Sequence, residues 1–189
     1  MVVGRLELDG AARLRELRAL GCTPEQAWQL FDSLPPVRVE EITTGLWRGD
    51  ELDTGHPWKG VLVESGWYGK QFDSADAVQP LVFATPGGDI FPVDPRRVPL
   101  FLAGRVPNAT LRPVRRSLGV LRPLLRTTTA RARLRDLGFR GISSAAMIYD
   151  HLPIIDIFRR VDEDTLLGVM DMRGLPEPYF FVLFRDPTG

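Results

Sequence analysis

Cysteine is almost absent from this sequence, which contains only Cys22. A single cysteine excludes an intramolecular disulfide and is typical of a protein in a reducing compartment. The first residues alternate charged side chains with short apolar runs and lack the apolar segment of a signal peptide. Apolar runs approaching the roughly 18 residues that cross a bilayer are also missing. We therefore expect a soluble, cytoplasmic protein.

Histidine and lysine are scarce as well, with two of each: His56, His151, Lys59 and Lys70. No cluster of His, Cys and Asp has the spacing of a zinc site, and neither a glycine-rich phosphate loop nor a Gly-x-Ser-x-Gly motif occurs. We therefore predict no metal, no cofactor and no catalytic residue, and an enzyme is the less favoured interpretation. The formal net charge of zero gives no reason to expect a nucleic-acid partner. The oligomeric state has no signature in the sequence.

Residues 9–34 predict an N-terminal helical hairpin. Leucines recur at helical spacing up to Leu20, and Gly21 ends the first helix. Thr23, followed by Pro24 and Gln26, has the pattern of a capping box that begins a second helix. Two prolines at 35 and 36 end it. We expect the hairpin to cover one end or face of the rest of the protein.

From Val37 onward the pattern predicts short β-strands joined by links of hairpin length, which favours antiparallel pairing. A first group at 37–93 includes strands at 37–41, 60–70 and 78–84, and a second group at 130–186 includes strands at 130–137, 139–150, 153–161, 165–172 and 179–185.

Several of these strands are apolar on both faces, most clearly residues 179–184. Such a strand needs cover on both sides, which a barrel interior and an outer helical layer provide, and closure also removes exposed edges. We predict a single barrel domain over 1–189, mainly β and antiparallel, with about eight to ten strands, the helical hairpin and a helical insert. A barrel of this size has room for one small apolar ligand; a filled barrel is the alternative.

Residues 95–126 interrupt the strands and predict the basic helical insert. Asp94 before Pro95 fits a helix start, and residues 111–126 mix leucine and arginine at helical spacing. Between positions 96 and 140 twelve arginines stand against one acid, Asp136. This mixture suits an anionic membrane surface, whereas the alternative is an ordinary amphipathic helix with a solvated basic face. We predict that the insert lies across a barrel mouth and makes peripheral membrane contact through Arg115, Arg116, Arg122 and Arg126.

The sequence Gly45-Leu-Trp-Arg-Gly49, with Thr54-Gly-His-Pro57 and Gly66-Trp-Tyr-Gly-Lys-Gln-Phe72, resembles the GXWXG-motif family. The segments 145–150, 153–159 and 167–171 are similar to the family's companion C-terminal domain of unknown function. The resemblance implies a lipocalin-like β-barrel with a suspected role in binding lipids or other hydrophobic ligands, and it implies no catalytic residues.

Lipocalins and haem-binding nitrobindins also place a Gly-x-Trp motif early in a barrel, which is a further likeness. Lipocalins pack an arginine from the end of the last strand over that tryptophan. The likeness therefore predicts a structural cation–π contact of Arg185 with Trp47.

Aspartates at 150, 156 and 171 occur within apolar strands. An inward carboxylate would need a partner such as Lys70 or Arg159, whereas an outward one is ordinary strand surface, which we favour. We predict the binding or carriage of a lipid or other small hydrophobic ligand. A haem- or NO-binding protein with His56 or His151 as ligand, and an enzyme acting on a small hydrophobic substrate, are the alternatives. The candidate ligand-binding residues are Trp47, His56, Trp67, Tyr68, Lys70, Met147, Tyr149, Asp156, Arg159 and Met170.

Overall fold

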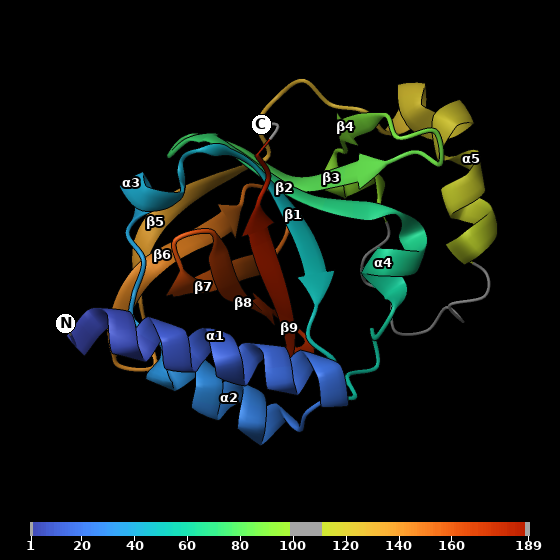
Figure 1. Cartoon of the computed structure of the whole chain (residues 1–189). Coiled ribbons are helices and arrows are strands. Elements are labelled where there is room, and N and C mark those ends of the chain that lie inside the picture. The colour runs from blue at the N-terminus through green and yellow to red at the C-terminus, as the bar shows by residue number, and fades with distance from the viewer. Residues whose placement is uncertain (1, 99–110, 188–189) are drawn as a thin grey trace.

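The computed structural model describes residues 2–98 and 111–187, and its centre is an antiparallel β-barrel (Figure 1). The described strands are β1 Gly45–Glu51, β2 Trp67–Ser74, β3 Ala77–Ala84, β4 Ile90–Pro92, β5 Ala132–Phe139, β6 Ile142–Tyr149, β7 Ile154–Asp162, β8 Thr165–Met172 and β9 Leu175–Arg185.

Eight of these strands close into a ring. The order β2-β1-β9-β8-β7-β6-β5-β3 returns to β2 through the pairing of β2 with β3, and β4 pairs with β3 outside the ring. The pairing of β3 with β5 is the shortest in the ring, because Val78 and Ala132 are the only described residues paired between these two strands. The predicted mainly β, antiparallel, lipocalin-like barrel is confirmed.

The helices lie around this barrel. They are α1 Val2–Leu20, α2 Pro24–Ser33, α3 Val39–Ile42, α4 Val61–Ser65, the 3₁₀ helix η1 Pro95–Arg97 and α5 Leu111–Leu125. The predicted capping box begins α2: the Thr23 hydroxyl accepts a hydrogen bond from the Gln26 amide at 3.3 Å, and the Gln26 side chain accepts one from the Thr23 amide at 2.9 Å. Helices α1 and α2 run side by side across one face of the barrel (Figure 1).

Apolar layers on both sides of the sheet explain the strands that are hydrophobic on both faces. In β9, Tyr179, Phe181 and Leu183 point into the barrel core, whereas Phe180 and Val182 belong to a second core between the sheet and the helical hairpin. The hairpin covers the outer face because its apolar stripe needs burial as much as the sheet does.

Two predicted strands are wrong. Residues 37–41 contain the start of α3, where the Glu41 carboxylate accepts a hydrogen bond from the Arg38 amide and closes a helical turn. Residues 60–70 are not one strand, because α4 lies between Gly60 at φ 77° and Gly66 at φ 91°. These left-handed backbone angles break an extended chain, so β2 begins only at Trp67.

The predicted helix at 111–126 is confirmed as α5, which packs against α4 at one end of the barrel (Figure 1). Asp94 caps only the three-residue helix η1. The part of the insert at 99–110 lies outside the described residues.

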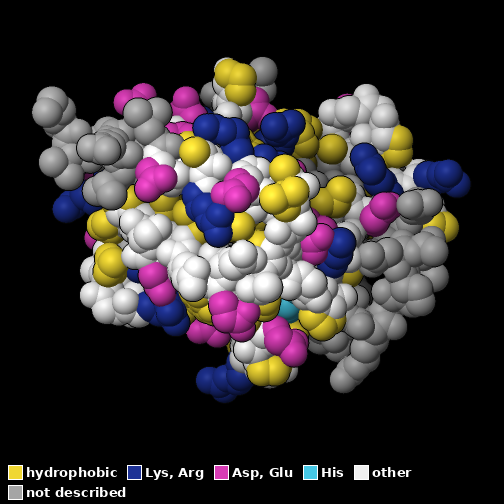
Figure 2. Space-filling view, turned by 60° about the horizontal axis from the view of Figure 1, so that its bottom comes forward, with side chains coloured by type: hydrophobic (Ala, Val, Ile, Leu, Met, Phe, Trp, Pro, Cys, Tyr) yellow, Lys and Arg dark blue, Asp and Glu magenta, His cyan; other side chains and the backbone are white. Residues whose placement is uncertain are grey.

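Charge on the surface is mixed. Figure 2 views the molecule from the side of the helical hairpin, where basic and acidic side chains are interspersed among hydrophobic ones. None of the helices within the described ranges combines the length and the hydropathy needed to cross a membrane.

Candidate functional site

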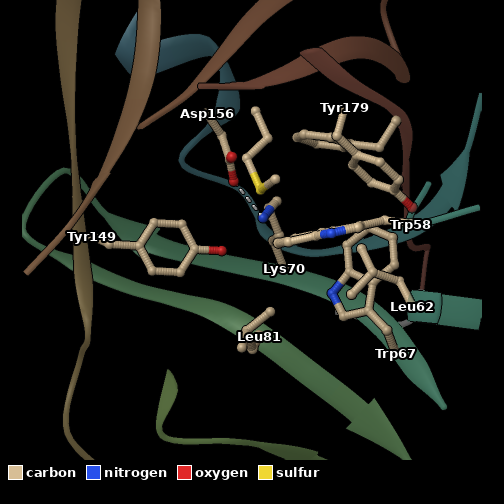
Figure 3. A pocket seen from close by; sticks show the side chains of 10 residues that line it. Trp58, Leu62, Trp67, Lys70, Leu81, Tyr149, Asp156 and Tyr179 are labelled. Atoms are coloured by element: carbon tan, nitrogen blue, oxygen red, sulfur yellow. Dashed lines mark hydrogen bonds and ion pairs between the residues drawn. The ribbon is translucent and has the colours of Figure 1, made fainter. Parts of the chain in front are cut away.

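A small cavity lies inside the barrel toward the end where α4 crosses it (Figure 3). Its volume is about 20 Å³, which is room for one water-sized group. Aromatic side chains make up half of its lining, and among the described residues this cavity is much smaller than the ligand-sized space expected from the strand number. The cavity is lined by Trp58, Leu62, Trp67, Lys70, Leu81, Tyr149, Asp156, Met170, Tyr179 and Phe181.

A buried ion pair forms the polar wall of this cavity. Lys70 on β2 donates a hydrogen bond from Nζ to Asp156 Oδ2 on β7 at 2.7 Å, and its side chain and that of Asp156 are 4% and 2% exposed. A second bond joins Nζ to the Pro80 carbonyl at 3.3 Å. Burial raises the pKa of the Asp156 carboxyl, and the nearby Lys70 charge opposes this rise.

Aromatic rings surround the Lys70 ammonium group. Nζ lies 5.0 Å from the ring centroid of Phe181, 5.7 Å from that of Trp67 and 5.8 Å from that of Tyr149. The negative faces of such rings stabilise a cation where water is excluded. This wall therefore supports a positive charge with one carboxylate and three rings instead of solvent.

Several polar atoms at this wall have no partner within the described part of the chain. Asp156 Oδ1 and Trp67 Nε1 are buried without a hydrogen bond. Tyr149 is also buried, and no hydrogen bond of its hydroxyl is found among the described residues; Figure 3 shows the hydroxyl directed toward the cavity. Burial and, secondarily, the Asp156 charge raise the pKa of Tyr149 well above its ordinary value, so the phenol is protonated at neutral pH. Unpaired buried donors and acceptors are unfavourable unless water or a ligand satisfies them.

Glycines give the cavity wall its shape. A Cβ built on Gly49 would lie 2.1 Å from Trp67 Cη2, and one built on Gly168 would lie 2.4 Å from the Phe181 ring. A third glycine, Gly69, packs against the backbone of the Trp47 strand, 1.9 Å from built Cβ to carbonyl oxygen. The second glycine of the Gly-x-Trp-x-Gly motif thus makes room for the indole of Trp67 in the cavity wall.

The segment between β1 and β2 closes the end of the cavity with Trp58 and Leu62. Glu51 holds this segment, because its carboxylate accepts hydrogen bonds from the Gly60 amide at 2.8 Å and from the Tyr179 hydroxyl at 3.0 Å. Behind α4, Leu118 of α5 lies so close to Gly66 that a Cβ there would be 2.8 Å from Leu118 Cδ1. Trp58 and Leu62 therefore cover the cavity at this end of the barrel.

The candidate ligand-binding residues divide into three groups. Five line the cavity, namely Trp67, Lys70, Tyr149, Asp156 and Met170. Three are buried in or beside the barrel core but do not line the cavity, namely Trp47, Met147 and His56. The other two lie elsewhere: the Tyr68 hydroxyl bonds Asp186, and Arg159 faces the helical hairpin, with its guanidinium 4.8 Å from the Phe31 ring.

The favoured outward orientation of the three aspartates is wrong for Asp156, which points inward and pairs with Lys70, and right for Asp150 and Asp171, which are exposed. The cavity-lining residues that we did not select are Trp58, Leu62, Leu81, Tyr179 and Phe181. Trp58 follows Pro57 in turn-like sequence and carried no strand pattern. Tyr179 and Phe181 belong to a strand that is apolar on both faces, so the sequence did not show which of its residues face the cavity.

The cation–π contact predicted from the lipocalin likeness is confirmed. The Arg185 guanidinium lies 4.5 Å from the Trp47 ring centroid, and Trp47 is completely buried. The same guanidinium donates to Asp164 at 2.8 Å and to the Glu163 carbonyl at 3.0 Å. The cation–π contact joins the end of β9 to Trp47 of β1, and the hydrogen bonds hold the guanidinium against the turn between β7 and β8. These contacts give Trp47 a structural role.

The described residues do not fit a haem. His151 is exposed in the link between β6 and β7, and His56, although buried, does not line the cavity. The His56 Nδ1 atom accepts a hydrogen bond from the Trp58 amide at 3.0 Å. No group of three or more His, Cys, Asp or Glu side chains able to hold a metal occurs within the described ranges.

Comparisons with known proteins match both halves of the chain. Residues 29–88 are similar to the family described as GXWXG protein, and residues 130–185 to the domain of unknown function DUF4334. A crystal structure of a protein from Thermomonospora curvata is 34% identical, with 94% of this chain and 99% of that chain covered and a TM-score of 0.69. None of the curated proteins compared with the chain matches it.

Proposed function

This chain belongs to the GXWXG protein family and carries the companion domain DUF4334, and we propose that it binds a small hydrophobic ligand inside its barrel. The observation that carries this proposal is the cavity between Lys70, Asp156 and Tyr149. One wall has polar atoms without a hydrogen-bond partner in the described part of the chain, and apolar side chains line the rest. A ligand with an apolar body and one polar oxygen matches this division.

The ligand enters by displacing the side chains of Trp58 and Leu62. The cavity of about 20 Å³ accepts only the polar end of a ligand, so the apolar body takes the place of Leu62. Leu62 belongs to the five-residue helix α4, which contacts α5 and the ends of β1 and β2. An element this short is stabilised mainly by such packing and can shift as a unit.

Binding of octanol, followed by quenching of tryptophan fluorescence and by native mass spectrometry, tests the proposal. Leu62→Ala removes the side chain that occupies the ligand path and should tighten binding at least tenfold, whereas Leu62→Trp should abolish it. Val63→Ala is the matched control, because Val63 is the exposed neighbour on the same helix. Octanol that fails to bind both the wild type and Leu62→Ala contradicts the proposal.

We also propose that α5 brings the barrel mouth to an anionic membrane, the source of the apolar ligand. Val120 and Leu124 are 83% and 68% exposed, and they lie one turn apart on the same helical face. Arg115 and Arg116 are exposed about one turn before Val120, and the α5 sequence contains no acidic residue. An exposed apolar stripe beside basic side chains favours the interface of a negatively charged bilayer.

Sedimentation with vesicles of phosphatidylcholine, with and without phosphatidylglycerol, measures this contact. Val120→Glu with Leu124→Glu should remove binding to the anionic vesicles, and high salt should weaken it in the wild type. Leu20→Glu serves as the control, since Leu20 is an equally exposed leucine on α1, at 81%. Equal loss in this control, or no binding by the wild type, would refute the membrane contact.

A further inference from the structure

Lys70 is the only lysine of the chain inside the barrel; the other one, Lys59, is exposed and pairs with Asp53 at 2.6 Å. A desolvated lysine amine in an apolar pocket is the usual nucleophile toward carbonyl compounds. We propose that Lys70 condenses reversibly with an apolar aldehyde to form a Schiff base, which makes the carbonyl group the polar end of the ligand. This inference rests on the proposed function, because the aldehyde reaches Lys70 through the same cavity.

The geometry supplies a proton acceptor for the amine. Asp156 Oδ2 accepts the hydrogen bond from Lys70 Nζ at 2.7 Å, so the ammonium proton can pass directly to the carboxylate. Burial raises the pKa of the Asp156 carboxyl, which favours the protonated form of the acceptor. The neutral amine then faces the cavity with its lone pair.

The condensation needs no oxidant or reductant. The amine lone pair forms the C–N bond while the carbonyl π electrons move to oxygen, which takes the proton held by Asp156. The nitrogen then returns one proton to Asp156 and leaves a neutral carbinolamine. That proton moves to the hydroxyl group, the C–O bond breaks, water departs, and the nitrogen lone pair completes the C=N bond. The product is a protonated Schiff base beside an ionised Asp156, so the total charge is unchanged.

Tyr149 and the aromatic rings favour this reaction over simple binding. The Tyr149 phenol, protonated and directed toward the cavity (Figure 3), donates to the carbonyl oxygen as negative charge develops on it. The rings of Trp67, Tyr149 and Phe181 surround the nitrogen at 5.0 to 5.8 Å and stabilise the cationic product as they stabilise the ammonium group. Asp156 Oδ1, which has no hydrogen-bond partner among the described residues, is available to the departing water.

Reductive trapping tests the inference, because sodium cyanoborohydride converts a Schiff base into a stable alkyl amine. The folded wild type is treated with octanal and cyanoborohydride at neutral pH, and peptide mass spectrometry locates the label. Lys70 should be labelled at least tenfold faster than the exposed Lys59, and Lys59→Arg should leave this rate unchanged. Lys70→Arg keeps the positive charge beside Asp156 and should lose the label, while Tyr149→Phe should slow labelling at least tenfold.

Octanol binding by the same samples separates the two levels of the argument. Label confined to Lys59 and the amino terminus, with octanol still bound, overturns the Schiff-base inference and leaves the binding function intact. Label at Lys70 that is no faster than at Lys59, or that persists unchanged in Tyr149→Phe, also overturns it. Absence of both labelling and octanol binding refutes the function and the inference together.

Discussion

The buried pair of Lys70 and Asp156 predicts a strongly non-additive response to substitution. Lys70→Met leaves Asp156 buried without its cation. Asp156→Leu leaves the ammonium group without its carboxylate, with the Pro80 carbonyl at 3.3 Å and the three rings as its remaining described contacts. Removing one member of a buried ion pair costs roughly 3 to 5 kcal/mol of the free energy of unfolding. Replacing both members with apolar side chains of similar size is neutral, or stabilising by about 1 to 4 kcal/mol.

The magnitudes make the experiment decisive. If the two losses added, the double variant would lose about 6 to 10 kcal/mol, which is comparable to the whole stability of a typical domain. We expect it instead to unfold in urea at or above the wild-type midpoint, with a coupling free energy of several kcal/mol between the two positions. Lys59→Met, at the exposed ion pair with Asp53, is the control and should leave the midpoint unchanged.

An additive loss in the double variant would refute this reasoning, because it would mean that each side chain is stabilised by contacts other than its partner. The predicted outcome has a functional consequence. A pair that adds little to stability compared with an apolar replacement is consistent with the proposed role of Lys70 and Asp156 in the cavity.

Three further changes test the roles of other residues. Gly49→Ala places a methyl group 2.1 Å from Trp67 Cη2 and should lower the free energy of unfolding by about 1 to 3 kcal/mol or more, measured in urea. Arg185→Ala removes the cation 4.5 Å from the Trp47 ring and should cost about 2 kcal/mol by the same assay. Asp94 forms ion pairs with Arg96 at 2.8 Å and Arg131 at 2.9 Å, and the hydrogen bonds from the Arg96 side chain lower the pKa of its carboxyl to about 2 from 3.8. After allowance for solvent screening it contributes about 1 to 2 kcal/mol of stability, which is present above about pH 5 and lost as pH falls through about 2. The difference in stability between wild type and Asp94→Asn should therefore shrink over this range.

Matched variants define what would contradict these expectations. Gly138→Ala meets no atom within 4 Å, so an equal loss there would mean that Gly49→Ala acts through strand propensity and not through Trp67. Arg185→Lys retains the charge, and a loss as large as that of Arg185→Ala would assign the effect to the hydrogen bonds of the guanidinium. A pH-independent difference for Asp94→Asn would show that the hydrogen bond to the Arg96 amide, at 3.1 Å, outweighs the ion pairs.

The sequence by itself determined the barrel and its helical cover. Strands 179–184 and their neighbours carry apolar residues on both faces, and such strands are stable only between two layers, which a barrel with an outer hairpin provides. The capping box at Thr23 and the leucine periodicity located the helical hairpin. Both signals are local, because they depend on residues only three or four positions apart. The contact of Arg185 with Trp47 was predicted only through the likeness to lipocalins.

Only the tertiary structure decided the site. Lys70 and Asp156 are 86 residues apart, and whether Asp156 faces inward depends on strand register, because a shift of one residue moves every side chain to the opposite face. The sequence pattern of β7 did not settle this, since apolar layers on both sides remove the alternation that would distinguish the faces. Leu62 reaches the cavity because left-handed Gly60 and Gly66 set the direction of α4, and Trp58 lies in the segment that Glu51 holds through the Gly60 amide. Long-range packing sets this path, and local propensity does not.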